Sequence, residues 1–155
     1  MTRRRLLLGA AALLALAQLV PLSRSNPPVE QEVDAPPGAR AVLERSCFDC
    51  HSNQTRWPWY AWVAPASWLL ARDVSEAREH MNFSTWNRYD AEERADHLEE
   101  IAEVVEEGEM PPWFYLPLHP KARLSQPDVA AIHAWTGEAP PADGAHSHRH
   151  GDHGH

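Results

Sequence analysis

The chain has 155 residues, which is enough for one domain. Its 14 Lys and Arg residues against 22 Asp and Glu residues give a net charge of −8. No acid precedes residue 26, so the remainder has ten cations against 22 acids, a net charge of −12. This acidic body excludes nucleic acid as a partner, because phosphates need Lys and Arg. Two cysteines exclude a disulfide-rich scaffold and a Cys₄ metal site.

Residues 1–22 have the pattern of an export signal. Met1–Arg5 is basic, Leu6–Val20 is apolar apart from one Gln, and Pro21 follows. Residues 6–22 are at the short end of a membrane span, and we expect an uncleaved anchor in the inner membrane. The arginines would stay in the cytoplasm, with the domain in the periplasm or on an outer face. The alternatives are a signal cleaved near Ala15–Ala17, which gives a soluble secreted protein, and a twin-arginine signal.

Two low-complexity segments flank the expected domain at residues 38–137. Residues 23–37 contain four prolines and no apolar periodicity, which predicts an extended linker. Residues 138–155 are expected to be a disordered tail. The tail is also a candidate site for Zn²⁺, Ni²⁺ or Cu²⁺. Its histidines are His146, His148, His150, His153 and His155.

Within the domain every periodic segment is helical. Residues 39–47 and 65–81 place apolar residues at helical spacing. The Asp90–Glu93 run has the form of a capping box, and the helix after it should end near Gly108. A last helix is predicted from Ser125 to Gly137. No segment alternates like a strand, so the fold class is all-α: a small helical domain after an N-terminal hydrophobic helix.

The most specific motif is Cys47-Phe48-Asp49-Cys50-His51, the Cys-x-x-Cys-His run of c-type haem attachment. Residues three apart lie on one helix face, so both thiols can form thioethers to one porphyrin edge. The imidazole of His51 then points at the iron. The alternatives are a dithiol redox centre, which would need a βαβ pattern, and half of a zinc site, which lacks further cysteines.

Met110 is the candidate for the sixth iron ligand. Met/His ligation is usual in cytochromes c, and Pro111-Pro112 would stiffen the loop that carries this thioether. A methionine that fills a core gap is the alternative at this position. Met81 is expected to be in the core or on the surface, and His80 and His119 are the reserve ligands.

Several blocks of the chain resemble the small bacterial haem-binding domain proteins, which are related to monohaem cytochromes c. The similarity covers roughly residues 26–135 and is carried by residues 46–55, 57–60, 87–89 and 106–111. The resemblance implies an all-α, cytochrome c-like domain on a membrane anchor, with one covalent haem and His51 as its proximal ligand. The role of Met110 is our inference from its position.

Other side chains are weaker candidates for the haem pocket. Four aromatic residues are expected to wall the haem edge and exclude water: Trp57, Trp59, Tyr60 and Trp62. Arg56 and Arg72 are expected to pair with the haem propionates, unless they are simply solvated. The acidic run over residues 92–109 is expected to be a solvated helix face or a docking site for a basic redox partner.

Together these features predict a membrane-tethered monohaem cytochrome that transfers electrons outside the cytoplasm and transforms no substrate. Its redox partner proteins are not identified by the sequence. One alternative is a haem enzyme or a gas or redox sensor with an open or displaceable sixth position. The other is a metal-handling protein that works through the His-rich tail.

Overall fold

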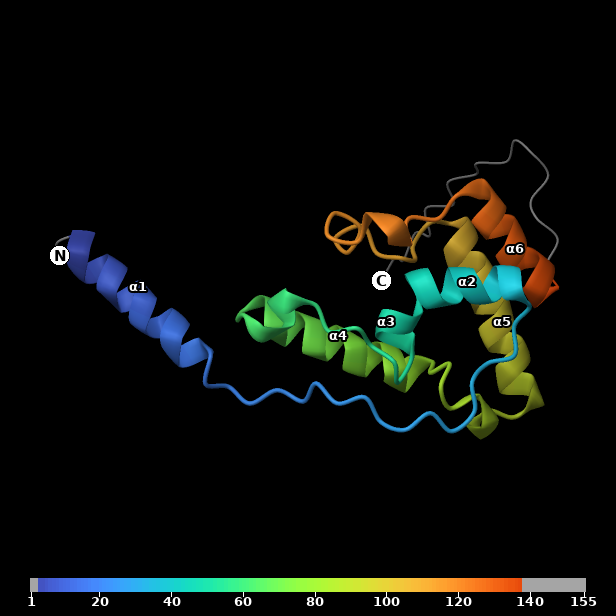
Figure 1. Ribbon diagram of the computed structural model, residues 1–155, viewed down its shortest axis with the longest axis horizontal. Coiled ribbons are helices and arrows are strands. Elements are labelled where there is room, and N and C mark those ends of the chain that lie inside the picture. Colours follow the sequence, from blue (N-terminus) through green and yellow to red (C-terminus); the bar gives the residue numbers. More distant parts are fainter. Residues whose placement is uncertain (1–2, 138–155) are drawn as a thin grey trace, which may run out of the picture.

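The computed structural model describes residues 3–137, and these residues form helices joined by loops (Figure 1). Within this range the only strand-like pairing is one isolated bridge between Gln31 and Thr85. The α-helices are α1 (Arg3–Ala17), α2 (Pro37–Ser46), α3 (Phe48–His51), α4 (Ala66–His80), α5 (Ala91–Glu106) and α6 (Gln126–Thr136). Short 3-10 helices are η1 (Trp59–Trp62), η2 (Trp86–Arg88) and η3 (Pro120–Ala122). The predicted all-α class is therefore confirmed for the described residues.

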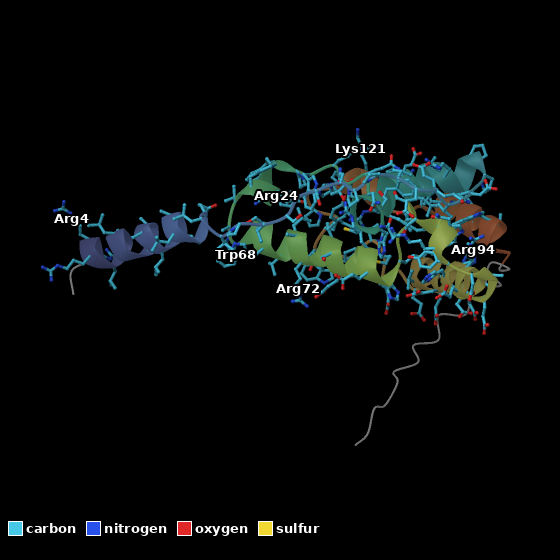
Figure 2. All side chains as sticks on the ribbon, turned by 90° about the horizontal axis from the view of Figure 1, so that it is seen from below. Arg4, Arg24, Trp68, Arg72, Arg94 and Lys121 are labelled. Carbon is cyan, nitrogen blue, oxygen red and sulfur yellow. The ribbon has the colours of Figure 1, made fainter. Side chains whose placement is uncertain are left out.

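Helix α1 stands apart from the other helices in Figure 1, and its side chains project freely in Figure 2. None of its residues is buried, and each of its leucines exposes more than half of its surface. Among the described residues, no helix combines the length and the apolar character needed to cross a membrane. The membrane anchor predicted from residues 1–22 stays a prediction.

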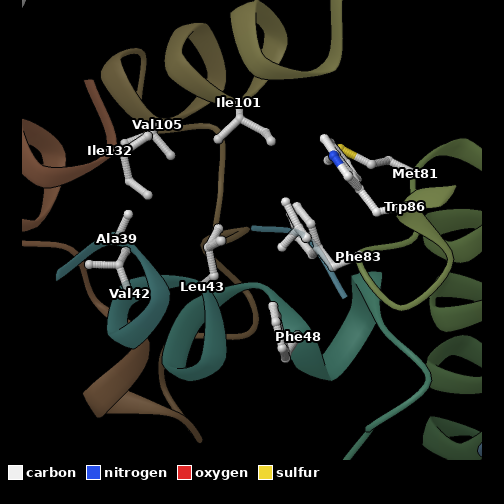
Figure 3. Packing of buried hydrophobic residues seen from close by; sticks show 11 residues of the cluster. Ala39, Val42, Leu43, Phe48, Met81, Phe83, Trp86, Ile101, Val105 and Ile132 are labelled. Carbon is white, nitrogen blue, oxygen red and sulfur yellow. The ribbon is translucent and has the colours of Figure 1, made fainter. Parts of the chain in front are cut away.

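The core lies where α2, α5 and α6 pack together, and Figure 3 shows its side chains. Helix α5 contributes the apolar stripe predicted from its sequence, with Ile101, Ala102 and Val105 buried. Such a stripe forms because positions three and four apart share one helix face. The core cluster consists of Val33, Ala39, Val42, Leu43, Phe48, Met81, Phe83, Trp86, Ile101, Val105 and Ile132.

The ends of α5 follow from local chemistry that the sequence displays. The Asp90 carboxylate accepts hydrogen bonds from the backbone N–H groups of Glu92 and Glu93, both at 2.9 Å. The Glu93 carboxylate accepts in turn from the Asp90 N–H at 2.9 Å, which completes the predicted capping box. Beyond the last turn Gly108 has a φ of +72°, a left-handed conformation that suits glycine and turns the chain toward the next loop.

The other predicted helices are also present, with small shifts at their ends. The helix predicted over residues 39–47 is α2, and that over residues 65–81 is α4. A second capping box, formed by Ser125 and Asp128, starts helix α6. The helix is followed by Gly137, whose φ is +83°.

The segment predicted as a linker is extended, but it packs against the domain. The backbone N–H of Val33 donates to the Phe83 carbonyl at 2.9 Å, and the N–H of Glu30 donates to the Ser84 carbonyl at 2.9 Å. The Val33 side chain is 2% exposed and belongs to the core. Helical or strand periodicity could not reveal this, because a single apolar side chain in an extended segment has no period.

This docking predicts that Val33→Ala destabilises the folded domain. Removal of two buried methyl groups should lower the free energy of unfolding by about 2 kcal/mol, through lost apolar burial and the cavity left behind. Denaturant unfolding of the purified holoprotein, followed by far-UV circular dichroism, measures this loss. The matched control is Val29→Ala, because Val29 lies in the same segment and is 43% exposed. Equal stability of the two variants would contradict the docking.

Candidate haem-attachment site

The predicted attachment motif consists of Cys47, directly after α2, and the single helical turn α3. The Cys47 carbonyl accepts hydrogen bonds from the N–H of Cys50 at 3.1 Å and from the N–H of His51 at 2.9 Å. Both cysteines are free thiols. The turn places the two cysteines three residues apart on one helical turn, with His51 directly after them. The structure therefore brings the three motif residues together.

The two thiol groups are withdrawn from solvent, although each cysteine as a whole is partly exposed. Burial, with a smaller contribution from Cys50, raises the pKa of Cys47 to about 12. Burial and the charge of Asp49 raise the pKa of Cys50 to about 11. Dithiol redox centres work through a thiol whose pKa is lowered. The raised values therefore do not support the alternative of a dithiol redox centre.

His51 is held in the orientation that an axial ligand requires. Its Nδ1 atom lies 3.1 Å from the Met81 carbonyl oxygen, so Nδ1–H donates and the Nε2 lone pair is left for a metal. Burial lowers the pKa of His51, and the hydrogen bond to Met81 opposes that shift. The lowered pKa favours the neutral imidazole, which is the form that binds iron. Met81 thus supports the site through its backbone rather than its sulfur.

The loop that carries the Met81 carbonyl is tied to the motif by backbone and aromatic contacts. The N–H of Phe83 donates to the His51 carbonyl at 2.8 Å. The Phe83 ring stacks on Phe48 with centroids 5.5 Å apart and on Trp86 with centroids 6.0 Å apart. Because Phe48 lies inside the motif, these stacked rings couple the motif to the core.

A buried polar network fixes the same loop. Asn82 Nδ2 donates to Asn53 Oδ1 at 2.9 Å, and Asn82 Oδ1 accepts from the Ser84 N–H at 2.9 Å. The Ser84 hydroxyl accepts from the Asn53 N–H at 2.9 Å, and the Tyr89 hydroxyl accepts from the Asn82 N–H at 2.8 Å. Satisfied buried networks rigidify their surroundings, since any broken member leaves a costly unpaired group. This network holds the loop on which His51 depends.

Arg78 is a site residue that the sequence analysis did not identify. Its guanidinium donates four hydrogen bonds to the segments on either side of the motif. The acceptors are the carbonyls of Ser52 and Ser25, the Asn26 side chain and the Thr55 hydroxyl, at 2.8–3.0 Å. One arginine therefore clamps the chain after His51 to the docked N-terminal segment. The sequence did not indicate this role, because an arginine in a predicted helix is most simply explained by an exposed helix face.

The candidates for a second axial ligand are in different environments. Met110 lies on the loop after α5. Its backbone N–H donates to the Val104 carbonyl at 3.2 Å, and the residue is 39% exposed. Met81 is 6% exposed and lies in the core, which was one of the two environments predicted for it. His80 Nε2 contacts Glu100 at 2.6 Å, and His119 Nε2 contacts the Tyr60 hydroxyl at 2.7 Å. Both histidines therefore already have a partner for the nitrogen that would bind iron.

The domain has two long loops, residues 52–65 and residues 107–119, and they meet beside the motif. The contact of Tyr60 with His119 joins them, and the His119 ring stacks on Tyr115 with centroids 3.9 Å apart. The Tyr115 hydroxyl donates to Asp49 at 2.9 Å, inside the attachment motif. Burial and the charge of Asp49 raise the pKa of Tyr115, so the phenol stays protonated and remains a donor.

The predicted pocket residues are divided between separate regions. Trp57 and Arg72 line a cavity of about 470 Å³ on α4, whereas Arg56 lines another of about 610 Å³ beside Asp49. Arg72 also pairs with Glu76 at 2.6 Å, so the structure does not bring the two arginines to one pair of propionates. Trp59 and Trp62 are 74% and 62% exposed, so they are not part of the core.

The predicted tail site lies outside the described residues. Those histidines are His146, His148, His150, His153 and His155. Within residues 3–137, no group of three or more His, Cys, Asp or Glu side chains is placed to hold a metal ion.

Residues 12–138 match the haem-binding domain family. The chain belongs to this family. No curated protein and no solved structure matches the chain. The match covers every site residue described above except the histidines of the predicted tail site, and it supports haem as the cofactor.

The residues of the motif fit a haem. His51 offers the Nε2 lone pair of an imidazole whose Nδ1 is held by the Met81 carbonyl, and two free thiols lie on the same turn. Large apolar side chains on the nearby loops remain exposed and are available to an apolar cofactor: Met110, Trp113, Phe114 and Leu118. A donor set of one imidazole and two thiols beside apolar side chains suits a porphyrin.

The clamp predicts a large effect of Arg78→Met on stability. The carbonyls of Ser52 and Ser25 lose their charged donor, and the free energy of unfolding should fall by about 2–4 kcal/mol. Guanidinium unfolding of the holoprotein, followed through its haem absorbance, measures the change. Arg72→Met is the matched control, because Arg72 pairs only with Glu76 on the surface of the same helix among the described residues. It should shift stability by at most about 0.5 kcal/mol, and a similar loss in both variants would disprove the clamp.

Proposed function

We propose that this haem-binding protein is a monohaem c-type cytochrome that transfers electrons outside the cytoplasm. Cys47 and Cys50 hold the haem through thioethers, His51 is one axial ligand, and Met110 is the other. The observation that carries the proposal is the hydrogen bond between His51 Nδ1 and the Met81 carbonyl, next to two free thiols. Together with the family match, this arrangement supports an attached haem and a fixed axial ligand.

The bound haem supplies a one-electron Fe(III)/Fe(II) couple. The protein's part is to keep the ligand set unchanged between the two states. The Met81 carbonyl orients His51 and increases the basicity of its Nε2. The stacked rings of Phe48 and Phe83, with the network of Asn53 and Asn82, hold that carbonyl in place. A rigid ligand frame suits electron transfer because little has to rearrange when the charge changes.

The redox partner is proposed to be a basic protein that docks on α5. This helix carries acidic side chains along its exposed face, in a chain with a net charge of −8. Electrostatic complementarity of this kind mainly accelerates encounter between partners. The partner is defined here by its charge alone.

The proposed location is on the outer side of a membrane, with the N-terminal segment as the tether. Three arginines precede the apolar run, and the leucines of α1 are exposed. Basic residues before an apolar run favour retention of that end in the cytoplasm. Exposed leucines over a whole helix are favourable only against an apolar surface.

Covalent attachment is tested by haem extraction. Haem should stay with the denatured wild-type chain through acid–acetone treatment, because thioethers survive conditions that release a haem held only by its iron. The Cys47→Ala, Cys50→Ala double variant should release its haem completely under the same treatment. Ser46→Ala is the matched control and should retain it. Extraction of all haem from the wild type, with both thiols free, would overturn the proposal of a c-type site.

The role of Met110 is tested by optical spectroscopy and redox titration. Met110→Ala should abolish the weak long-wavelength charge-transfer band of an Fe(III)–thioether bond, admit CO and lower the reduction potential, because Met favours Fe(II). Met81→Leu is the control: it removes the other nearby sulfur, preserves core volume, and should change none of these. An unchanged band in Met110→Ala would exclude Met110 as the ligand. CO binding by the wild type would favour the open-site enzyme or sensor.

A further inference from the structure

A group of apolar side chains protrudes at the end of the domain nearest to α1. They come from η1, from the residue after it and from the start of α4, and we call them the tryptophan tip: Trp59, Trp62, Val63, Trp68 and Leu69. Their exposed fractions are 74%, 62%, 46%, 38% and 60%. Single exposed apolar residues are ordinary, but five within eleven positions form a surface that water solvates poorly.

The tryptophan tip is joined directly to the chain that leaves α1. The Ala64 N–H donates to the Gln18 side chain at 3.0 Å, one residue beyond α1. Arg24 Nε donates to the Ala61 carbonyl at 2.6 Å, and its guanidinium stacks over the Trp62 ring at 4.4 Å. Figures 1 and 2 both place the start of α4 beside the end of α1, and Figure 2 labels Arg24 and Trp68 there. The tip is therefore continuous with the exposed leucines of α1.

Acidic residues are absent from this region of the sequence. The chain has 22 Asp and Glu residues, yet none lies in residues 1–29 or 50–72, which supply α1, the following segment and the tip. In the part of the chain that the structure describes, no carboxylate lies within salt-bridge distance of Arg24. The acidic helix α5 is at the other end of the molecule in Figure 1. The tip is thus apolar and weakly cationic on an otherwise acidic protein.

We propose that the tryptophan tip rests in the interface of a phospholipid bilayer, with Arg24 directed at anionic headgroups. This inference rests on the membrane tether of the proposed function. Tryptophan favours the headgroup level because its ring is apolar and its N–H is polar. Each cation near an anionic bilayer surface adds attraction, and the absence of carboxylates removes the opposing repulsion. A protein partner for this patch would have to fit beside α1, against the bilayer that the tether contacts.

This contact gives the domain one orientation on the membrane. The tip faces the lipid, and the acidic face of α5 is directed away from it, toward soluble partners. Tyr60 lies in η1, within the tip segment, and its hydroxyl contacts His119 beside the attachment motif. The lipid contact therefore also fixes the position of the motif relative to the membrane.

Photolabelling of the full-length holoprotein tests the inference. The protein is reconstituted into phosphatidylcholine–phosphatidylglycerol vesicles that contain a phospholipid with a diazirine near its glycerol backbone. After irradiation, labelled peptides are mapped by mass spectrometry. We expect label on residues 57–69 as well as on residues 3–20. In the Trp59→Ser, Trp62→Ser variant, label on residues 57–69 should fall several-fold while label on residues 3–20 is unchanged. Both tryptophans are largely exposed, so this variant should fold normally.

The matched control is Val29→Ser, which removes an exposed apolar side chain from the segment before α2. It should leave the labelling of residues 57–69 unchanged. Label on residues 3–20 alone would overturn the lipid contact and leave the tether intact. Label on residues 57–69 alone would support the contact and reject the tether. Absence of label from both segments would reject both.

Discussion

The hydrogen bond from His51 Nδ1 to the Met81 carbonyl is the interaction on which the rest of the site depends. It fixes the imidazole tautomer with the proton on Nδ1, which leaves the lone pair on Nε2. A backbone carbonyl can serve in this way only if its loop is rigid. The loop from Met81 to Trp86 is held from three directions: by aromatic stacking on the motif, by the asparagine network and by the docked N-terminal segment.

This dependence explains why so small a domain buries so many polar groups. Ser52, Asn53, Asn82 and Ser84 are all buried, and each takes part in hydrogen bonds. An apolar core would fill the same space, but it would not specify the direction of a single carbonyl. Hydrogen bonds specify that direction because they are directional. In a low-dielectric interior, any arrangement that breaks one of them leaves an unpaired polar group and costs free energy. Arg78 extends the same frame to the surface and connects it with the segment before α2.

The distribution of charge gives the molecule two functional ends. The acidic residues of α5 are at one end, and the acid-free tryptophan tip is at the other, next to α1. The attachment motif on α3 lies between them in the fold and packs against α4. Its Asp49 carboxylate joins it to both long loops, since it accepts from the Arg56 N–H and from the Tyr115 hydroxyl. In the proposed function this places the haem between a lipid-facing end and an end that attracts basic proteins.

The sequence alone determined the features that depend on neighbouring residues. The capping box at Asp90, the apolar stripe of α5, the stop at Gly108 and the turn from Cys47 to His51 are all local, so spacing predicts them. Only the tertiary structure decided which carbonyl holds His51, that Val33 enters the core and that Arg78 clamps the chain after His51 to the N-terminal segment. These contacts join residues 23–53 positions apart, and no local period encodes which distant partner a side chain meets.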